Sequence, residues 1–250
     1  MFDKFKKQGD SSVQKSQDRV GGFVPIASGI YEAVIKQLWF GEYGSGAGYM
    51  DLQLEVAGKT FRERILLSDR NGNNFWTKDG KSTFFDGFMD LDAICLFVTG
   101  EDFEANMDNI ENKMVKVYNA DQKKEVPTEV PVMANVIGET IKVAILHRKV
   151  DVTQKTEENG KTVYKPTGEF REENTLSKVL DVDTNRTVTE IIDEVESPVY
   201  ADAWVARWAG KVSNEAKGVA GGGGAAGKPS ASGGAAGASK GRGSGMFGKK

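Results

Sequence analysis

Cysteine and histidine are almost absent from this chain of 250 residues, which has one of each, Cys95 and His147. A single cysteine excludes an intrachain disulfide, and its scarcity is typical of proteins from a reducing compartment. Zinc sites, Ser/His triads and Cys/His dyads need more ligands or bases than the chain owns, so they are nearly excluded. A magnesium site built from oxygen ligands alone remains compatible with the composition.

Long apolar runs are missing as well. No stretch approaches the roughly 20 apolar residues that a membrane-spanning helix needs. The first residues, MFDKFKKQGDSS, contain no apolar stretch after their lysines, so they do not resemble a secretory signal. We therefore expect no membrane association and a cytoplasmic location.

Acidic residues are absent from the segment 218–250, which consists mostly of Gly, Ala, Ser and Lys. Its five basic side chains are Lys228, Lys240, Arg242, Lys249 and Lys250. The whole chain has 33 basic and 36 acidic side chains, so removing those five leaves 28 against 36 and a net charge of −8 for residues 1–217. The composition predicts a disordered tail (218–250), since it buries too little apolar surface to offset its ordering entropy.

The tail contains a small apolar tip, Met246-Phe247. A tethered tip has a high effective concentration near its anchor, so we expect these two residues to bind a partner protein. An inert solubilising tail is the alternative. The polar composition of residues 1–22 predicts a flexible leader at the other end.

Alternation of apolar and polar residues predicts three antiparallel strands in the first third of the chain. They cover residues 30–40, 50–56 and 61–67, and Ala57-Gly58-Lys59 forms a short hairpin connection between the second and the third. In the first strand, one face carries Ile30, Val34, Leu38 and Phe40, and the other carries Tyr31, Ala33, Ile35 and Trp39. Both faces are apolar, so this strand is expected to be well buried.

A change to three- and four-residue spacing of apolar residues predicts a helix over 85–98, which Gly100 is placed to end. Two more strands are expected at 113–118 and 140–150. Between them, residues 126–138 contain two prolines, and a helical turn is expected within this segment. Three strands, a helix and two strands predict a mainly β protein with the OB-fold, a five-stranded barrel with a helix between strands 3 and 4.

A long charged hairpin is expected to extend this barrel. Asn159-Gly160 is a strong turn signal between two polar runs and predicts a hairpin extension (151–182). The predicted OB-fold domain, including this extension and the helices that follow it, covers residues 23–217.

Two helices are expected within residues 187–210. The first covers 187–195, and the second begins with Ser197 as N-cap and Pro198 at the first helical position. Trp204 and Trp208 share one face of the second helix because they are four residues apart. We expect them to dock that helix onto the body of the protein.

Three segments carry a resemblance to a known family. They are Ile65–Trp76 (ILLSDRNGNNFW), Glu125–Val132 (EVPTEVPV) and Pro166–Asn174 (PTGEFREEN). Together they resemble the single-stranded DNA-binding proteins of tailed bacteriophages, and the likeness covers roughly residues 28–195 plus the Gly-rich tail.

The resemblance implies an OB-fold that coats single-stranded DNA during phage replication, recombination and repair, in the host cytoplasm, with no catalytic residue and no cofactor. It also implies replication or recombination proteins as partners of the tail, and a homo-oligomer is compatible with it. The tail departs from the wider class of single-stranded DNA-binding proteins, whose tip is typically acidic, because the tip here is basic. Contacts of the kind that an acidic tip makes with such partners are therefore not implied for this tail.

The candidate site follows from what a protein needs in order to coat a single strand of DNA. Single strands expose phosphates and base faces, so a binder combines cations along a groove with aromatic rings for stacking. In an OB-fold the ligand crosses strands 2 and 3 between two flanking loops. The side chains predicted to bind DNA are Tyr43, Tyr49, Gln53, Lys59, Arg62, Arg64, Arg70, Phe75, Trp76, Arg148, Tyr164, Lys165, Phe170 and Arg171.

Several of these side chains have a structural alternative. Arg62 and Arg64 can pair across strands with Asp51 and Glu55 instead of contacting DNA. Phe75 and Trp76 can form a lid over the barrel end. Three other aromatic residues are expected in the core: Trp39, Phe61 and Tyr118.

Two other classes of function are considered. One is a protein-interaction scaffold with an OB-like barrel and a recruiting tail. The other is a magnesium-dependent nuclease that uses Asp86, Asp90 and Asp92. An exposed acidic face of the helix explains these three carboxylates more simply than a metal site does.

Overall fold

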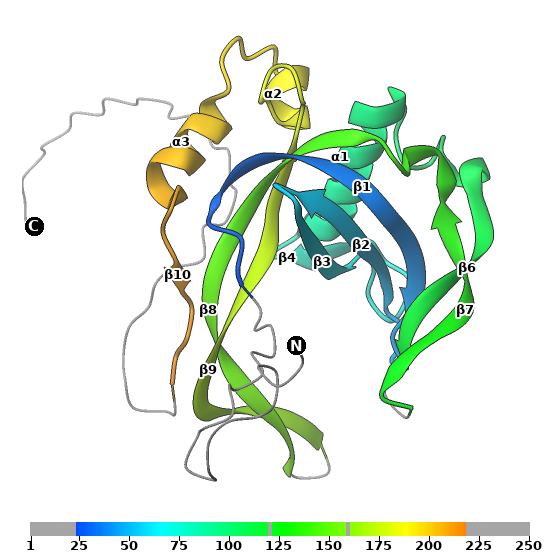
Figure 1. Ribbon diagram of the computed structural model, residues 1–250, viewed down its shortest axis with the longest axis vertical. Coiled ribbons are helices and arrows are strands. Elements are labelled where there is room, and N and C mark those ends of the chain that lie inside the picture. Colours follow the sequence, from blue (N-terminus) through cyan, green and yellow to red (C-terminus); the bar gives the residue numbers. More distant parts are fainter. Residues whose placement is uncertain (1–23, 120–121, 159–160, 219–250) are drawn as a thin grey trace, which may run out of the picture.

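In the computed structural model, residues 24–119, 122–158 and 161–218 are described (Figure 1). The strands are β1 (Gly29–Glu42), β2 (Gly48–Val56), β3 (Lys59–Leu66), β4 (Phe75–Lys78), β5 (Lys81–Phe84), β6 (Ile110–Asn119), β7 (Lys124–Met133), β8 (Thr140–Glu158), β9 (Lys161–Leu180) and β10 (Ser213–Asn214). The helices are α1 (Asp86–Thr99), α2 (Val188–Ile192) and α3 (Val199–Trp208), with short 3-10 turns η2 (Met107–Asn109) and η3 (Ala134–Val136). The fold is mainly β, as the sequence predicts. The predicted leader, most of the predicted tail and the tip Met246-Phe247 lie outside the described residues.

The first three strands form the predicted antiparallel meander. The connection between β2 and β3 is a two-residue turn at Ala57 and Gly58, whose φ angles are 49° and 73°. Positive φ at both positions is the geometry of the tight hairpin turn that matches strand twist. The short hairpin predicted here is therefore confirmed.

A β-bulge in β1 changes which side chains face the core. The pairing of β1 with β2 shifts register between Ile35 and Gln37. Before the shift, Ala33 and Ile35 pack into the main core, and after it Leu38 does so. The predicted faces of this strand are therefore wrong beyond the bulge, because one extra residue reverses the alternation. Trp39 then points to the opposite side of the sheet, where it joins a separate cluster.

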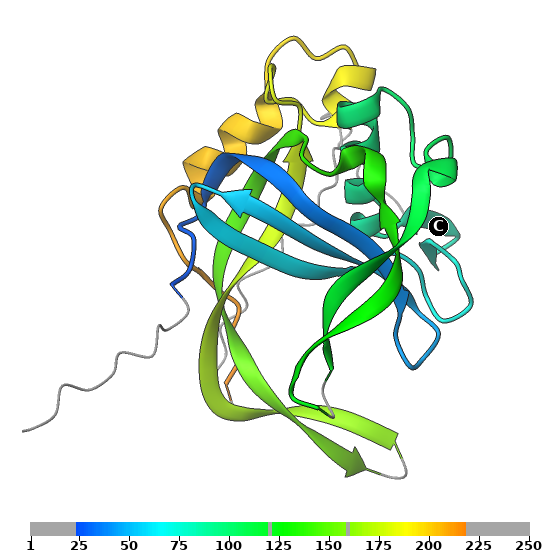
Figure 2. The ribbon, with the colours of Figure 1, turned by 45° about the vertical axis from the view of Figure 1, so that its right-hand side comes forward.

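Two long antiparallel ribbons, β6–β7 and β8–β9, extend beyond the meander on the same side of the molecule (Figure 1, Figure 2). The β8–β9 ribbon contains the predicted hairpin extension, although its turn at 159–160 lies outside the described residues. The helical turn predicted within 126–138 is present as η3 at its C-terminal end, whereas β7 covers the part of this segment that contains the two prolines. Pro127 and Pro131 fit in β7 because the second edge of that strand pairs only through Val132.

The eight-stranded sheet is open. Its central order is β10-β8-β1-β2-β3, and no backbone ladder joins β3 to β9 in the described part of the chain. A side chain bridges this seam instead. The Glu63 carboxylate accepts hydrogen bonds from the Thr175 hydroxyl and from the Leu176 backbone N–H, each at 2.6 Å. Burial raises the pKa of Glu63, and these two hydrogen bonds act in the opposite direction.

Helix α1 lies where the sequence predicts it and covers one end of the core. It ends at Gly100, which adopts a left-handed conformation with φ 79°. The additional hairpin β4–β5, which precedes α1, is not predicted from the sequence. It forms a separate two-stranded sheet.

Helices α2 and α3 lie at the end of the molecule opposite the ribbons (Figure 1). Helix α2 begins at Thr187 with a reciprocal capping box formed with Glu190. The predicted N-cap of α3, Ser197, is wrong, because Pro198 occupies that position and no side chain caps the helix. Trp204 is buried and donates to the Ser177 hydroxyl at 2.9 Å, so the predicted docking of α3 is confirmed. Among the described residues, none of the helices has the length and apolar character to span a membrane.

Gly87 in α1 provides a test of how closely this helix packs on β3. A Cβ added there would lie 2.3 Å from the Leu66 carbonyl oxygen and 2.4 Å from the Ile65 Cγ2. We expect Gly87→Ala to lower the free energy of unfolding by about 1–3 kcal/mol, as measured by urea denaturation, because backbone must move to relieve the overlap. Gly44→Ala is the control, since nothing lies within 4 Å of its added Cβ. An equal effect of both substitutions would contradict this packing.

Candidate nucleic-acid interface

The register of the meander arranges polar side chains in rows across its outer face. Trp39 of β1, Asp51 of β2 and Arg64 of β3 are directly paired from strand to strand. The next row contains Gln53 and Arg62. Their neighbours along each strand point into the main core, so these side chains share the outer face.

Asp51 lies at the centre of this face and is bonded to both arginines. Its Oδ1 accepts from the Arg62 Nε–H at 2.7 Å, and its Oδ2 accepts from the Arg64 terminal nitrogen at 3.0 Å and from the Arg64 Nε–H at 3.3 Å. The carboxylate side chain is only 5% exposed. The predicted pairing with Asp51 is confirmed. The predicted pairing with Glu55 is wrong, because Glu55 pairs with Lys36 of β1 at 2.7 Å.

An aromatic cluster adjoins the arginines. The Arg64 guanidinium lies 4.1 Å from the centroid of the Tyr49 ring, and the centroids of the Tyr43 and Tyr49 rings are 4.7 Å apart. Trp39 contacts Tyr49 edge-on at 5.8 Å. Tyr43 is 38% exposed, whereas Tyr49 and Trp39 are buried against the valines of β7. Partial burial raises the pKa of Tyr43, so its hydroxyl stays protonated at neutral pH.

Two loops meet beside this cluster. The Gly48 backbone N–H donates to the Ser68 hydroxyl at 3.1 Å. A Cβ added at Gly46 would lie 3.5 Å from the Arg70 carbonyl oxygen. The second loop is stabilised by Asp69, which accepts hydrogen bonds from the backbone N–H groups of two residues that follow it. These donors belong to Asn71 and Asn73, and the hydrogen bond from the Asn73 backbone N–H is the main reason that the pKa of Asp69 lies below its usual range. The predicted residue Arg70 is therefore placed next to the loop that contains Tyr43.

The β8–β9 ribbon holds a second group of predicted residues. Tyr164 and Phe170 are 66% and 48% exposed. The Lys149 ammonium lies 4.5 Å from the centroid of the Phe170 ring. This lysine is not among the predicted binding residues, because its contact arises only from cross-strand pairing on the ribbon.

The predicted cations of this ribbon are paired with carboxylates. Arg148 pairs with Glu173 at 2.7 Å and with Glu215 at 3.3 Å. Arg171 also pairs with Glu173, at 3.0 Å, and Lys165 pairs with Glu158. The ribbon therefore presents exposed rings with largely neutralised charge.

The remaining predicted residues lie elsewhere. Lys59 lies on the face of β3 opposite to Arg62, because side chains alternate along a strand. Its ammonium donates to the Pro25 carbonyl oxygen at 3.4 Å. Phe75 and Trp76 are exposed on the separate β4–β5 hairpin, and no contact links them to the arginines in the described part of the chain.

The core predictions for aromatic residues have mixed outcomes. Trp39 and Phe61 are buried, as predicted. Tyr118 is 59% exposed, so its assignment to the core is wrong. It lies on β6 opposite the face through which Val115 and Val117 pack on the cluster that contains Trp39. Side chains alternate between a covered and a solvent-exposed face of the β6–β7 ribbon, so Tyr118 is exposed where the valines are covered. The sequence alone does not reveal which face is covered.

The three carboxylates of α1 do not form a site. Asp90 is buried, which contradicts an exposed acidic face at this position. Asp92 accepts a hydrogen bond from the Phe103 backbone N–H at 2.9 Å. Within residues 24–119, 122–158 and 161–218, no group of three or more His, Cys, Asp or Glu side chains is arranged to hold a metal ion.

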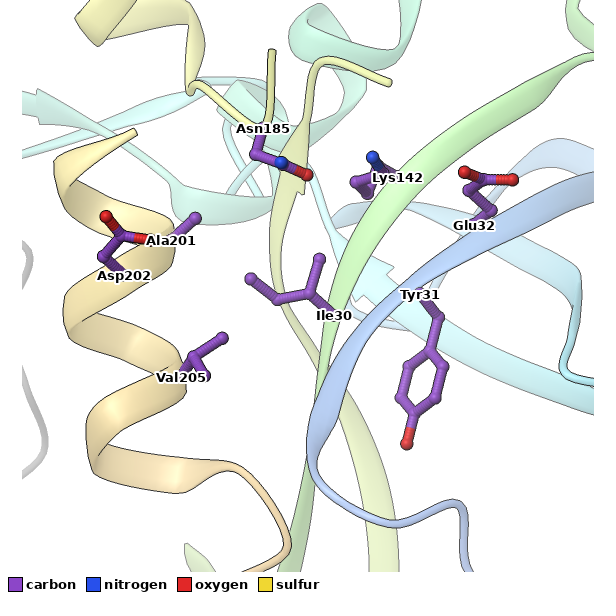
Figure 3. Close-up of a pocket in the computed structure, with 8 residues that line it drawn as sticks. All are labelled: Ile30, Tyr31, Glu32, Lys142, Asn185, Ala201, Asp202 and Val205. Carbon is purple, nitrogen blue, oxygen red and sulfur yellow. The ribbon is translucent and has the colours of Figure 1, made fainter. Parts of the chain in front are cut away.

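A groove separate from the predicted site lies between α3 and β1 (Figure 3). Val205 of α3 and Ile30 of β1 point toward one another across it (Figure 3). Glu32 and Asp202 contribute negative charge, and the Lys142 ammonium is bonded to the Val182 carbonyl at 2.5 Å. None of the predicted DNA-binding residues lines this groove.

Comparison with known proteins adds no family assignment, because no family model and no curated protein matches the chain. Evidence for function therefore comes from the side chains and their geometry.

Proposed function

We propose that this protein binds single-stranded DNA without sequence preference and coats it during phage replication, recombination and repair, without catalysing a reaction. The main support is the outer face of β1–β3, where Arg64 lies against the Tyr49 ring, the exposed Tyr43 adjoins that ring, and Asp51 joins Arg64 to Arg62. Cations next to stacking rings are what an unpaired strand requires, since it presents phosphates and base faces together.

The proposed architecture is an OB-like barrel whose last seam is closed by side chains. In support, β1 lies between β2 and β8 in the sheet, α1 follows the meander, and Glu63 bridges β3 to β9. In such a fold the ligand crosses the second and third strands. These are the strands that carry Asp51, Arg62 and Arg64.

The charge distribution favours single strands over duplex DNA. Residues 1–217 have a net charge of −8, from 28 basic and 36 acidic side chains. An acidic exterior repels a stiff, highly charged duplex, whereas a flexible single strand can follow a local basic and aromatic surface. Stacking adds about 1–3 kcal/mol for each base and needs no particular sequence.

A titration with oligo-dT against a matched duplex, at two salt concentrations, tests this proposal. We expect tight binding to oligo-dT, much weaker binding to the duplex, quenching of Trp and Tyr fluorescence, and loss of affinity as salt is added. Equal affinity for both DNAs, or no binding to oligo-dT at low ionic strength, would reject the proposal.

A protein-interaction scaffold is the second candidate, and exposed apolar side chains on α2 and α3 favour it. Ile192 is 72% exposed, and Val199 and Val205 are also exposed. Single exposed apolar residues are common, but three on adjacent short helices suit a protein partner. Indifference to both single strands and duplex in the titration above would favour this function over DNA coating.

A further inference from the structure

We propose that Asp51 is a positioning residue that holds Arg62 and Arg64 in one fixed array for the phosphates of a single strand. The inference rests on the proposed function and deepens it. Asp51 belongs to β2 and both arginines to β3, so the register of the two strands places one carboxylate between two guanidinium groups. The carboxylate is buried, whereas the arginine side chains are 33% and 40% exposed.

The hydrogen bonds leave the arginines able to bind more acceptors. A guanidinium has five N–H donors, and Arg62 uses only its Nε–H on Asp51. Arg64 uses its Nε–H and one N–H of a terminal nitrogen. The other terminal N–H groups remain for phosphate oxygens, apart from a long contact of 3.9 Å between Arg62 and Glu125. Planar donor groups of this kind match phosphate geometry well.

Arg64 is restrained in two directions. Asp51 holds one edge of its guanidinium, and the Tyr49 ring lies against one face at 4.1 Å. A long side chain that is already ordered loses less conformational entropy when a ligand binds. Asp51 therefore strengthens binding although it has the same sign of charge as DNA.

The direction in which removal of Asp51 changes the affinity for DNA separates a positioning role from simple charge neutralisation. If Asp51 only offset the positive charge of Arg62 and Arg64, its removal would raise the local potential and tighten DNA binding. If it positions them, its removal weakens binding. In Asp51→Asn, one oxygen still accepts a hydrogen bond, but the new NH₂ group faces the donors of a guanidinium. One arginine is then released.

We expect Asp51→Asn to weaken the binding of oligo-dT about tenfold, because a preorganised contact is lost. The salt dependence of binding should not decrease, because no cation has been removed. Arg64→Lys keeps the charge and lacks the Nε–H that binds Asp51, so we expect a similar loss of affinity. The matched control is Glu55→Gln, an acid-to-amide change at an exposed position of the same strand, with affinity within about twofold of wild type.

Folding is checked by thermal melting of each variant, and the arginine Nε–H resonances in a nitrogen-15 NMR spectrum give a readout without DNA. Wild type should show protected Nε–H signals for Arg62 and Arg64, in addition to that of Arg148, which donates to Glu173 at 2.9 Å. Asp51→Asn should lose or broaden the signal of Arg62 or Arg64 and leave that of Arg148 unchanged. Unchanged or tighter oligo-dT binding by folded Asp51→Asn would overturn the inference, and so would unchanged resonances. If Asp51→Asn does not fold, Arg64→Lys supplies the affinity test, and wild-type affinity in that variant would overturn the inference. Failure of the wild type to bind oligo-dT would instead reject the proposed function.

Discussion

Replacing both Arg62 and Arg64 by glutamine should weaken the binding of oligo-dT about 100-fold at low salt. Each arginine is expected to make one charge-assisted contact with a phosphate, and such a contact is worth about 1.5 kcal/mol or more. Two such contacts together correspond to about a 100-fold change in affinity. The plot of log affinity against log salt should also become shallower by about 1.4, since each phosphate contact contributes about 0.7 for a single strand.

The design must avoid leaving a buried charge. Asp51 is 5% exposed and bonded to both arginines, so their removal alone would leave an unpaired buried carboxylate. The variant therefore also carries Asp51→Asn. The control is Lys36→Gln with Glu55→Gln, an exposed pair across β1 and β2 whose two charges are removed together and neither of which is predicted to bind DNA. We expect that control to keep most of the affinity. A salt slope unchanged in the triple variant would contradict a role for these arginines at phosphates.

The second large effect concerns stability at neutral and alkaline pH. Asp90 of α1 is buried, and one of its carboxylate oxygens has no hydrogen-bond partner. Burial raises the pKa of Asp90 from 3.8 to about 7, and the charge of Lys178 opposes this shift. In the unfolded chain the same group ionises near 3.8. Between these two values the folded protein holds a proton that the unfolded protein has lost.

Below about pH 4, Asp90 is protonated in both states and does not reduce the free energy of unfolding. As the pH rises toward 7, that free energy falls, because the unfolded chain ionises at Asp90 and the folded protein does not. Each pH unit in this interval costs about 1.4 kcal/mol, so the total approaches about 4 kcal/mol. Asp90→Asn removes the ionisation. We expect it to raise the free energy of unfolding by about 2–4 kcal/mol at pH 8 and to change it little at pH 4, as measured by urea denaturation.

The control for this experiment is Asp86→Asn on the same helix. Asp86 is exposed in the first turn of α1, where a carboxylate interacts favourably with the helix dipole. We expect a small loss of stability at pH 8, opposite in sign to the effect of Asp90→Asn. An effect of Asp90→Asn that is the same at both pH values would show that ionisation of this carboxyl does not limit stability.

The local pattern of the sequence was informative wherever one face of an element is covered and the other is wet. In β2, Leu52 and Leu54 are buried and Glu55 is exposed, as their alternation predicts. The same reasoning located α1, because helical spacing differs from strand spacing. It failed in β1, where a single inserted residue reverses the faces after Ile35. It also missed the β4–β5 hairpin, whose residues are exposed on both sides and show no burial pattern.

The individual side chains of the candidate site could be predicted from the sequence, but the contacts between them could not. The polar face of the meander identified Arg62, Arg64 and Gln53, and the loop aromatics identified Tyr43 and Tyr49. The sequence offered Asp51 as a cross-strand partner of the arginines, and the register of β2 and β3 is what brings the carboxylate to both guanidinium groups. The sequence also did not reveal that the predicted cations of the β8–β9 ribbon are paired with carboxylates, Arg148 and Lys165 across the two strands and Arg171 along β9.

The sequence by itself determined the mainly β character, the meander, helix α1 and the long charged hairpin, because hydrophobic periodicity and turn residues act over a few neighbouring positions. Tertiary structure alone decided that β3 and β9 meet through the Glu63 carboxylate instead of a ladder, and that one buried aspartate holds two arginines. Both contacts join residues that are distant along the chain or on different strands. Their formation depends on register, twist and packing, which no local pattern encodes.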